Sequence, residues 1–321
     1  MVFDQLAILV ISVMVLAKSS SLVVEKIALI SKFFRISQIA IGFLFLATAT
    51  SLPELSVSVT SSAVGEGAIA AGNVFGSNIA NILLVLGAGA FLFGVRINRH
   101  NLSEIGLVLL LTTVISAYIV FNSSIQQQVL GFFEGMVLLG IFGIYVWYSL
   151  RKKRLDDGNG TAITKREALE AFILFGAGIV IVITSSGFVV SSAVHLAQAL
   201  GIAESFIGAT IIAVGTSLPE LSIDLQAIKK RKYGIALGDA IGSNMTNITL
   251  VLGTAAAINP IEVRLPVFIA ALLFAVIANT LLLYLSAVNR KMQRLSGALL
   301  LLIYAIYIAV IFGLQFRELG G

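Results

Sequence analysis

Two glutamates in matched apolar surroundings carry the main chemistry that this sequence offers. The heptapeptide TSLPELS begins at Thr50 and again at Thr216, so Glu54 and Glu220 occupy equivalent positions 166 residues apart. An ionised carboxylate in the middle of a bilayer costs at least about 2.5 kcal/mol unless a cation or a proton neutralises it. We therefore expect both glutamates to bind a cation. The alternative is that each only caps a kinked helix, which a neutral Gln would do at lower cost.

Prolines precede both glutamates and predict an interruption of each helix. Pro53 and Pro219 lack an N–H group and clash with the preceding turn, which frees backbone carbonyls there. Irregular backbone at membrane depth is tolerated where the freed groups line a cavity or meet an ion. Ser51 and Ser217, three residues before the glutamates, fit the capping-box pattern for a helix that begins again.

A second repeated motif adds neutral oxygen ligands. Gly-Ser-Asn begins at Gly76 and again at Gly242, and a further asparagine follows each motif. Serine and asparagine four residues apart share one helical face. The expected ligands are Ser77, Asn81, Ser243 and Asn247. With the carboxylates they form a hard oxygen set, suited to Ca2+ or Na+ and poor for Zn2+ or Cu. The alternative role is interhelical hydrogen bonding.

Long apolar segments must position these residues. The chain has 321 residues, of which 58% are hydrophobic and 12% charged, about half the charged share of a soluble domain. Ten runs approach or exceed the roughly 20 residues that cross a bilayer. We predict an all-α polytopic membrane protein with a broken second and seventh helix, because lipid-exposed backbone must satisfy its own hydrogen bonds. The spans are 4–29, 37–62, 68–93, 103–121, 126–150, 168–197, 203–228, 235–258, 266–287 and 295–315.

The two halves of the chain repeat one another. The TSLPELS, Gly-Ser-Asn and Leu-Val-Leu-Gly segments all recur at the same offset, which indicates an internal duplication. An odd number of spans in each copy forces the second copy to enter the membrane from the opposite side, the architecture of alternating-access carriers. The predicted organisation is a first five-helix repeat at 1–150, a linker at 151–167 and an inverted repeat at 168–321.

The distribution of basic residues predicts the orientation. Most of the 21 lysines and arginines fall in alternate connections, including the linker at 151–167. The positive-inside rule then puts both termini outside and the linker in the cytoplasm. We expect a multi-pass protein of the cell membrane. The basic runs are explained by topology beside anionic lipid, so no nucleic acid partner is expected, and no obligate protein partner is predicted.

Several other chemistries are disfavoured. The chain has no cysteine, and its two histidines, His100 and His195, stand in no metal-ligand spacing. An intramembrane hydrolase would need a nucleophile with a base, or paired aspartates, so we predict no enzyme and no cofactor. A cation channel could use the same ligands but would not need two inverted copies of a closed central site.

At the two motifs the chain resembles the cation/Ca2+ exchanger superfamily, which includes Na+/Ca2+ and H+/Ca2+ antiporters. The resemblance covers nearly the whole chain and implies that Glu54 and Glu220 are the central Ca2+ ligands. It also implies further ligand oxygens from four motif positions, namely Ala47, Thr50, Ala213 and Thr216. One departure is an amide at Asn247, where sodium exchangers of the family often have an acid.

Charge balance favours protons as the driving ion. Two glutamates are neutralised by one Ca2+ or by two protons, which should compete for the same oxygens, whereas three Na+ would leave an uncompensated charge. We therefore expect Ca2+/H+ antiport, with Na+/Ca2+ exchange as the alternative. Asp224 and Asp239, which replace Ser58 and Asn73 of the first copy, complicate this. They are expected to relay protons or attract cations, or else to be solvated acids in a cytoplasmic vestibule.

Overall fold

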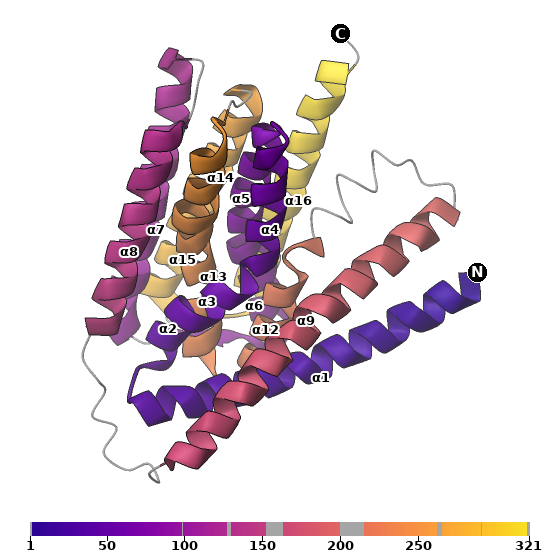
Figure 1. Cartoon of the computed structure of the whole chain (residues 1–321), viewed down its shortest axis with the longest axis vertical. Helices are drawn as coiled ribbons and strands as arrows, with labels where there is room; N and C mark the ends of the chain where they lie inside the picture. Colours follow the sequence, from indigo (N-terminus) through magenta and orange to yellow (C-terminus); the bar gives the residue numbers. More distant parts are fainter. Residues whose placement is uncertain are drawn as a thin grey trace. The chain divides into compact units, whose positions relative to one another are not determined.

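The computed structural model is helical apart from two short strands (Figure 1). It describes residues 2–97, 99–126, 130–151, 163–199, 215–261, 265–289 and 291–319. The chain forms two compact units, Met1–Thr50 with Lys153–Asp239, and Ser51–Lys152 with Ala240–Gly321. Each unit takes segments from both predicted repeats, so units and repeats do not coincide. The repeat boundaries remain a prediction from the sequence.

The first unit is built around two long helices. Its elements are α1 (Val2–Phe34), α2 (Gln38–Ile41), the π-helical turn η1 (Gly42–Leu46), α3 (Ala47–Thr50), α9 (Lys165–Ala199), α12 (Leu218–Lys229) and the first half of α13 (Tyr233–Thr246). Helices α1 and α9 run side by side, in indigo and rose in Figure 1, and α12 packs on α1. The hydroxyl of Ser20 on α1 donates to the hydroxyl of Ser222 on α12 at 2.8 Å.

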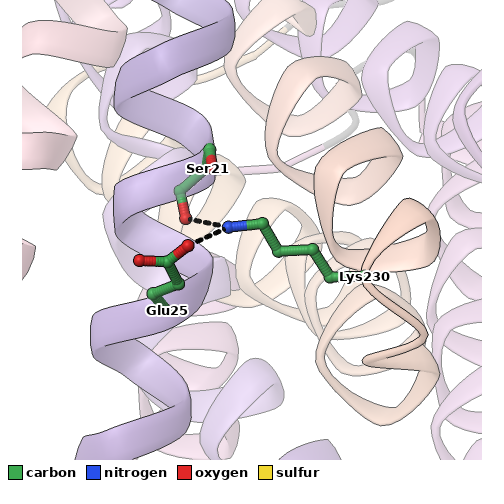
Figure 2. Close-up of polar contacts among 3 residues, drawn as sticks. All are labelled: Ser21, Glu25 and Lys230. Carbon is green, nitrogen blue, oxygen red and sulfur yellow. Dashed lines mark hydrogen bonds and ion pairs between the residues drawn. The ribbon is translucent and has the colours of Figure 1, made fainter.

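A lysine ties the end of α12 to α1. Lys230 Nζ donates to the Ser21 carbonyl at 2.9 Å and pairs with the Glu25 carboxylate (Figure 2). The Lys230 and Glu25 side chains are 25% and 61% exposed. Exposed ion pairs contribute at most about 1 kcal/mol, so this contact orients the end of α12 more than it stabilises the fold.

Two glycines let α13 approach the segment α2–η1 at backbone distance. A Cβ atom built on Gly238 would lie 2.4 Å from the Ile39 carbonyl oxygen, and one on Gly42 would lie 2.7 Å from the Ile235 oxygen. The obstacles are backbone atoms, which cannot rotate away. Only glycine fits at this crossing, which carries the start of the second Gly-Ser-Asn segment.

The second unit contains the remaining elements. They are α4 (Leu52–Ala63), α5 (Gly67–Ala80), the π-helical turn η2 (Asn81–Leu86), α6 (Gly87–Phe93), β1 (Val95–Arg96), α7 (Arg99–Gln126), α8 (Phe132–Arg151), the rest of α13, the π-helical turn η4 (Asn247–Val251), α14 (Leu252–Ile258), α15 (Leu265–Asn289), β2 (Lys291–Met292) and α16 (Arg294–Leu319). Strands β1 and β2 pair antiparallel, with Val95 opposite Met292.

Helices from distant parts of the sequence pack together within this unit. Helix α14 contacts α8 and α4, α15 contacts α7, and α16 contacts α6 (Figure 1). The Ser62 hydroxyl on α4 donates to the Ala255 carbonyl on α14 at 2.6 Å. An isolated bridge joins Leu130 to Ile261. Segments before and after the linker therefore share one core.

The described part of the chain confirms a polytopic membrane protein, while the count of ten spans stays a prediction. Seven of its helices are long and apolar enough to cross a bilayer, or eight if the segments on either side of Ser51 form one span. The expected span at 103–121 lies within α7, in which the stretch Ile105–Tyr118 is apolar. The expected span at 203–228 falls partly outside the described residues.

The glycine crossing predicts a specific instability. Gly238→Ala should lower the free energy of unfolding by about 1–3 kcal/mol, because the new methyl group overlaps backbone. Gly140→Ala on α8 is the control, since nothing lies within 4 Å of that Cβ position. Thermal unfolding of the detergent-solubilised protein measures both. Equal midpoints for Gly238→Ala and wild type would contradict the crossing.

Candidate cation-binding site

Glu54 lies at the start of a helix that begins again after a break. Helix α3 ends at Thr50, and Ser51 has φ −77° and ψ 6° before α4 begins at Leu52. Pro53 and Glu54 both occupy the first turn of α4, where proline needs no hydrogen-bond partner and the helix dipole favours a negative charge. The helix break predicted from proline is confirmed. The predicted capping box is wrong for the serine. Ser51 makes no side-chain cap hydrogen bond.

The Glu54 side chain is buried, with 1% of its surface exposed. The Ser77 hydroxyl on α5 donates to Glu54 Oε1 at 3.3 Å, so the structure brings together two predicted ligands. The Asn73 amide donates to the Glu54 carbonyl at 3.1 Å and to the Ser58 hydroxyl at 3.0 Å. These contacts hold α5 against the first turns of α4.

Four asparagines form a reciprocal network in the same unit as this glutamate. The Asn78 amide donates to the Asn244 carbonyl at 3.2 Å, and the Asn244 amide donates to the Asn78 carbonyl at 3.0 Å. The Asn81 amide donates to Asn244 Oδ1, and the Asn247 amide donates to Asn78 Oδ1, both at 3.2 Å. Each bond has a counterpart at the 166-residue offset, as a two-fold relation between duplicated segments requires.

The network fixes the side chains of Asn81 and Asn247 through their amide nitrogens, so their Oδ1 atoms are oriented without accepting a hydrogen bond from the described residues. The side-chain amides of Asn81 and Asn247 donate hydrogen bonds to Asn244 and Asn78. No donor among the described residues reaches Oδ1 of either side chain. Both are nearly fully buried. Each is the first residue of a π-helical turn, η2 or η4, a feature frequent at functional sites. A buried acceptor without a donor is a natural ligand for a hard cation.

Glu220 has the same local setting as Glu54. Ser217 has φ −88° and ψ 9°, helix α12 begins at Leu218, and Glu220 lies in its first turn with 1% of its surface exposed. Here too the predicted serine cap is absent, since Ser217 makes no side-chain cap hydrogen bond. Thr216 is half-buried. Ala213, the other ligand implied by resemblance in this segment, lies outside the described residues.

Thr50 and Ala47 occur together at the end of α3. The Thr50 hydroxyl contacts the Ala47 carbonyl at 3.3 Å and donates to Asp239 Oδ1 at 3.1 Å. Asp239 and Asp224 both have 0% exposure. The interpretation of these aspartates as solvated acids in a vestibule is therefore wrong, because neither side chain reaches solvent.

The structure adds a polar pocket that the sequence did not single out. It is lined by Phe75, Asn78, Thr112, Ser116, Asn244, Ile248, Ala275 and Asn279. The Asn279 amide on α15 donates to the Thr113 hydroxyl on α7 at 2.7 Å. Thr113 and Asn279 are also 166 residues apart, although their residue types differ. The repeat offset was therefore the signal in the sequence that could have pointed to this pair.

Neutral oxygens must complete any cation site in this part of the chain. Over the described ranges, no group of three or more His, Cys, Asp or Glu residues is placed to hold a metal ion. Buried carboxylates and amides on long apolar helices define the class of polytopic membrane proteins that handle ions within the bilayer.

Comparison with known proteins gives the family. The model of the sodium/calcium exchanger protein family matches residues 5–151 and 170–313, and the chain belongs to this family. It is 29% identical to the sodium/calcium exchanger MaX1 of Methanosarcina acetivorans, over 95% of this chain and 97% of that protein. It is 27% identical to the Ca2+/H+ antiporter ChaA of Bacillus subtilis, over 64% of this chain and 63% of that protein.

The fold is also found in solved structures. The sodium–calcium exchanger NCX_Mj, soaked with 10 mM Na+ and no Ca2+, superposes with a TM-score of 0.82. The two chains are 28% identical, and the match covers 96% of this chain and 99% of that one. The resemblance to the cation/Ca2+ exchanger superfamily is thereby confirmed.

The asparagine network predicts a measurable contribution to stability. Asn244→Ala should lower the free energy of unfolding by about 1–2 kcal/mol, because it removes two hydrogen bonds and strands buried polar groups. Thr60→Ala is the control, since that exposed hydroxyl bonds to carbonyls of its own helix. Denaturant unfolding in detergent compares the two. A midpoint for Asn244→Ala equal to that of Thr60→Ala would show that the network is not stabilising.

Proposed function

We propose that this protein is a Ca2+ antiporter of the cell membrane that works by alternating access, with Glu54 and Glu220 as its charged Ca2+ ligands. The observation that carries the proposal is a matched pair of nearly fully buried glutamates. Each lies in the first turn of a helix that begins directly after a serine, Ser51 or Ser217. The names of the relatives, a sodium/calcium exchanger and a Ca2+/H+ antiporter, support Ca2+ as the shared substrate.

Neutral oxygens complete the proposed ligand set. Ser77 contacts Glu54, and Oδ1 of Asn81 and of Asn247 receives no hydrogen bond from the residues that the structure describes. Ser243, Thr50, Thr216 and the backbone near Ala47 and Ala213 are assigned by the family resemblance. Carboxylate, amide, hydroxyl and carbonyl oxygens in these numbers suit the six to eight ligands that Ca2+ takes.

The proposed driving ion is H+. Two glutamates are balanced by one Ca2+ or by two protons, so each loaded form is neutral, whereas the empty dianion is costly within the membrane. Competition between Ca2+ and H+ for the same carboxylates would couple their movements in opposite directions. Amides at both Asn81 and Asn247 keep the negative charge of this ligand set at two.

Na+ is a second candidate, and two observations favour it. The full-length likenesses to MaX1 and NCX_Mj are to proteins named as sodium/calcium exchangers. In addition, Asp224 and Asp239 are buried acids, and the charge balance based on two glutamates does not count them. Either could supply the third negative charge that exchange for three Na+ would need.

The inverted repeat and the orientation are part of the proposal. Odd numbers of spans in the halves 1–150 and 168–321 would give the two copies opposite orientations, as in other alternating-access carriers. The basic linker at 151–167 would lie in the cytoplasm and both termini outside.

Neutralising either glutamate tests the assignment of the ligands. Glu54→Gln and Glu220→Gln should each reduce Ca2+ uptake into proteoliposomes by roughly 100-fold or more, because losing a buried charge partner costs at least about 2–5 kcal/mol. Glu66→Gln, an exposed glutamate at the start of α5, is the control and should transport normally. A glutamine variant that keeps the normal rate would remove the substituted glutamate from the site.

Imposed gradients distinguish the driving ions. Proteoliposomes loaded with Ca2+ should release it when an inward pH gradient is applied without Na+, if protons drive exchange. Release that requires an inward Na+ gradient and ignores the pH gradient would replace H+ with Na+. Release with neither counter-ion present would instead identify a channel.

A further inference from the structure

The two repeats differ at a pair of buried positions, which makes one repeat a natural control for the other. At the 166-residue offset, Ser58 corresponds to Asp224 and Asn73 to Asp239. In the first repeat the pair is neutral and bonded, since the Asn73 amide donates to the Ser58 hydroxyl at 3.0 Å. The same helical positions therefore accept an uncharged pair that needs no ion.

In the second repeat both positions are carboxylates in a fully buried setting. Asp224 and Asp239 each have 0% exposure, and their side chains adjoin one another. Within the described part of the chain, the charged groups that act on Asp224 are Asp239 and Glu220, and both are acids. A buried anion without a positive partner is strongly destabilised, so two adjoining ones require compensation.

Among the described residues, hydrogen-bond donors outside the pair of carboxyl groups do not provide that compensation. Thr50 donates to Asp239 Oδ1 at 3.1 Å. The two carboxyl groups hydrogen-bond to one another. Beyond this contact, both carboxylate oxygens of Asp224, and Oδ2 of Asp239, have no donor in the portion of the chain that the structure describes. Three buried carboxylate oxygens from α12 and α13 thus lack any donor from outside the pair in the described residues, and the hydroxyl at the end of α3 donates only to the fourth.

We propose that Asp224 and Asp239 together bind a hard cation, Na+ or Ca2+, through carboxylates that the two-glutamate ligand set of the proposed function does not include. Carboxylate and hydroxyl oxygens are the ligands such ions prefer, and Thr50 positions Asp239 by its hydrogen bond. Binding at this site does not require the function proposed above, whereas the part that the bound ion plays in exchange rests on it. Within exchange, the ion would add a second cation to the transport stoichiometry.

The first repeat supplies the decisive variant. Asp224→Ser together with Asp239→Asn recreates the Ser58–Asn73 pair, which this fold already accommodates, so the double variant should fold. Equilibrium binding of radioactive Na+ and of radioactive Ca2+ to the purified protein in detergent, in separate experiments, counts the ions held per chain. We expect the double variant to hold one ion fewer than wild type, for one of the two cations.

Controls separate this site from the proposed Ca2+ ligands. Glu54→Gln should keep the ion that the double variant loses, and Ser58→Ala, at the equivalent position of the first repeat, should leave the count unchanged. Loss confined to Na+ or to Ca2+ identifies the occupant, and either result supports the site. Equal counts in wild type and double variant, for both cations, would overturn it and leave a proton as the compensating charge.

If the double variant fails to fold, a single substitution still tests the site. Asp224→Asn keeps the shape of the side chain and the bond from Thr50 to Asp239, and it should lower affinity for the lost ion at least about tenfold. Normal transport by Glu54→Gln would disprove the proposed function without affecting this count. The two proposals can therefore fail independently.

Discussion

The structure depends on one constraint, which is that polar groups buried within a bilayer must find their partners inside the protein. Lipid offers no hydrogen bonds, so each buried donor needs an acceptor from the chain. In the asparagine network each amide group donates one hydrogen bond, and within the described residues no donor reaches the Oδ1 atoms of Asn81 and Asn247. Under the proposed function, the hydrogen bonds that fix these helices also leave the two oxygen atoms available to an ion. Stability and ligand geometry thus come from the same side chains.

Duplication gives the protein two versions of one local design. Both versions place a glutamate in the first turn after a proline-induced break, where the helix dipole favours its charge. They differ one turn after the glutamate, where Ser58 corresponds to Asp224, and on the next long helix, where Asn73 corresponds to Asp239.

Sequence reasoning predicted the features that depend on composition and on local chemistry. Apolar runs identified most spans, and the proline identified the break at Ser51. Ser77 and Asn81 share one helical face that was expected to face the glutamates, and Ser77 does contact Glu54. The capping serine was predicted wrongly because a sequence pattern does not fix the direction of a hydroxyl group. Burial of Asp224 was missed because acidity usually indicates solvent, and only packing reveals the depth of a side chain.

Other features had no signal in a single sequence. The partners of Asn78 and Asn244 follow from tertiary contacts, which helical periodicity does not determine. Asn81 and Asn247 were predicted as ligands, but the π-helical turns that they begin were not. Such turns arise from the position of one extra residue in the backbone ladder, and no side-chain pattern marks it.

Those two turns also limit how the length of the chain can change. Successive residues of an α-helix are rotated by about 100° about its axis, because 3.6 residues complete a turn. Deleting one residue from Asn81–Leu86 would restore a regular helix there and swing the downstream face away from its neighbours. Loops generally tolerate insertions. In these two interior segments, a change in residue number rotates every downstream side chain, whereas a substitution changes one side chain only.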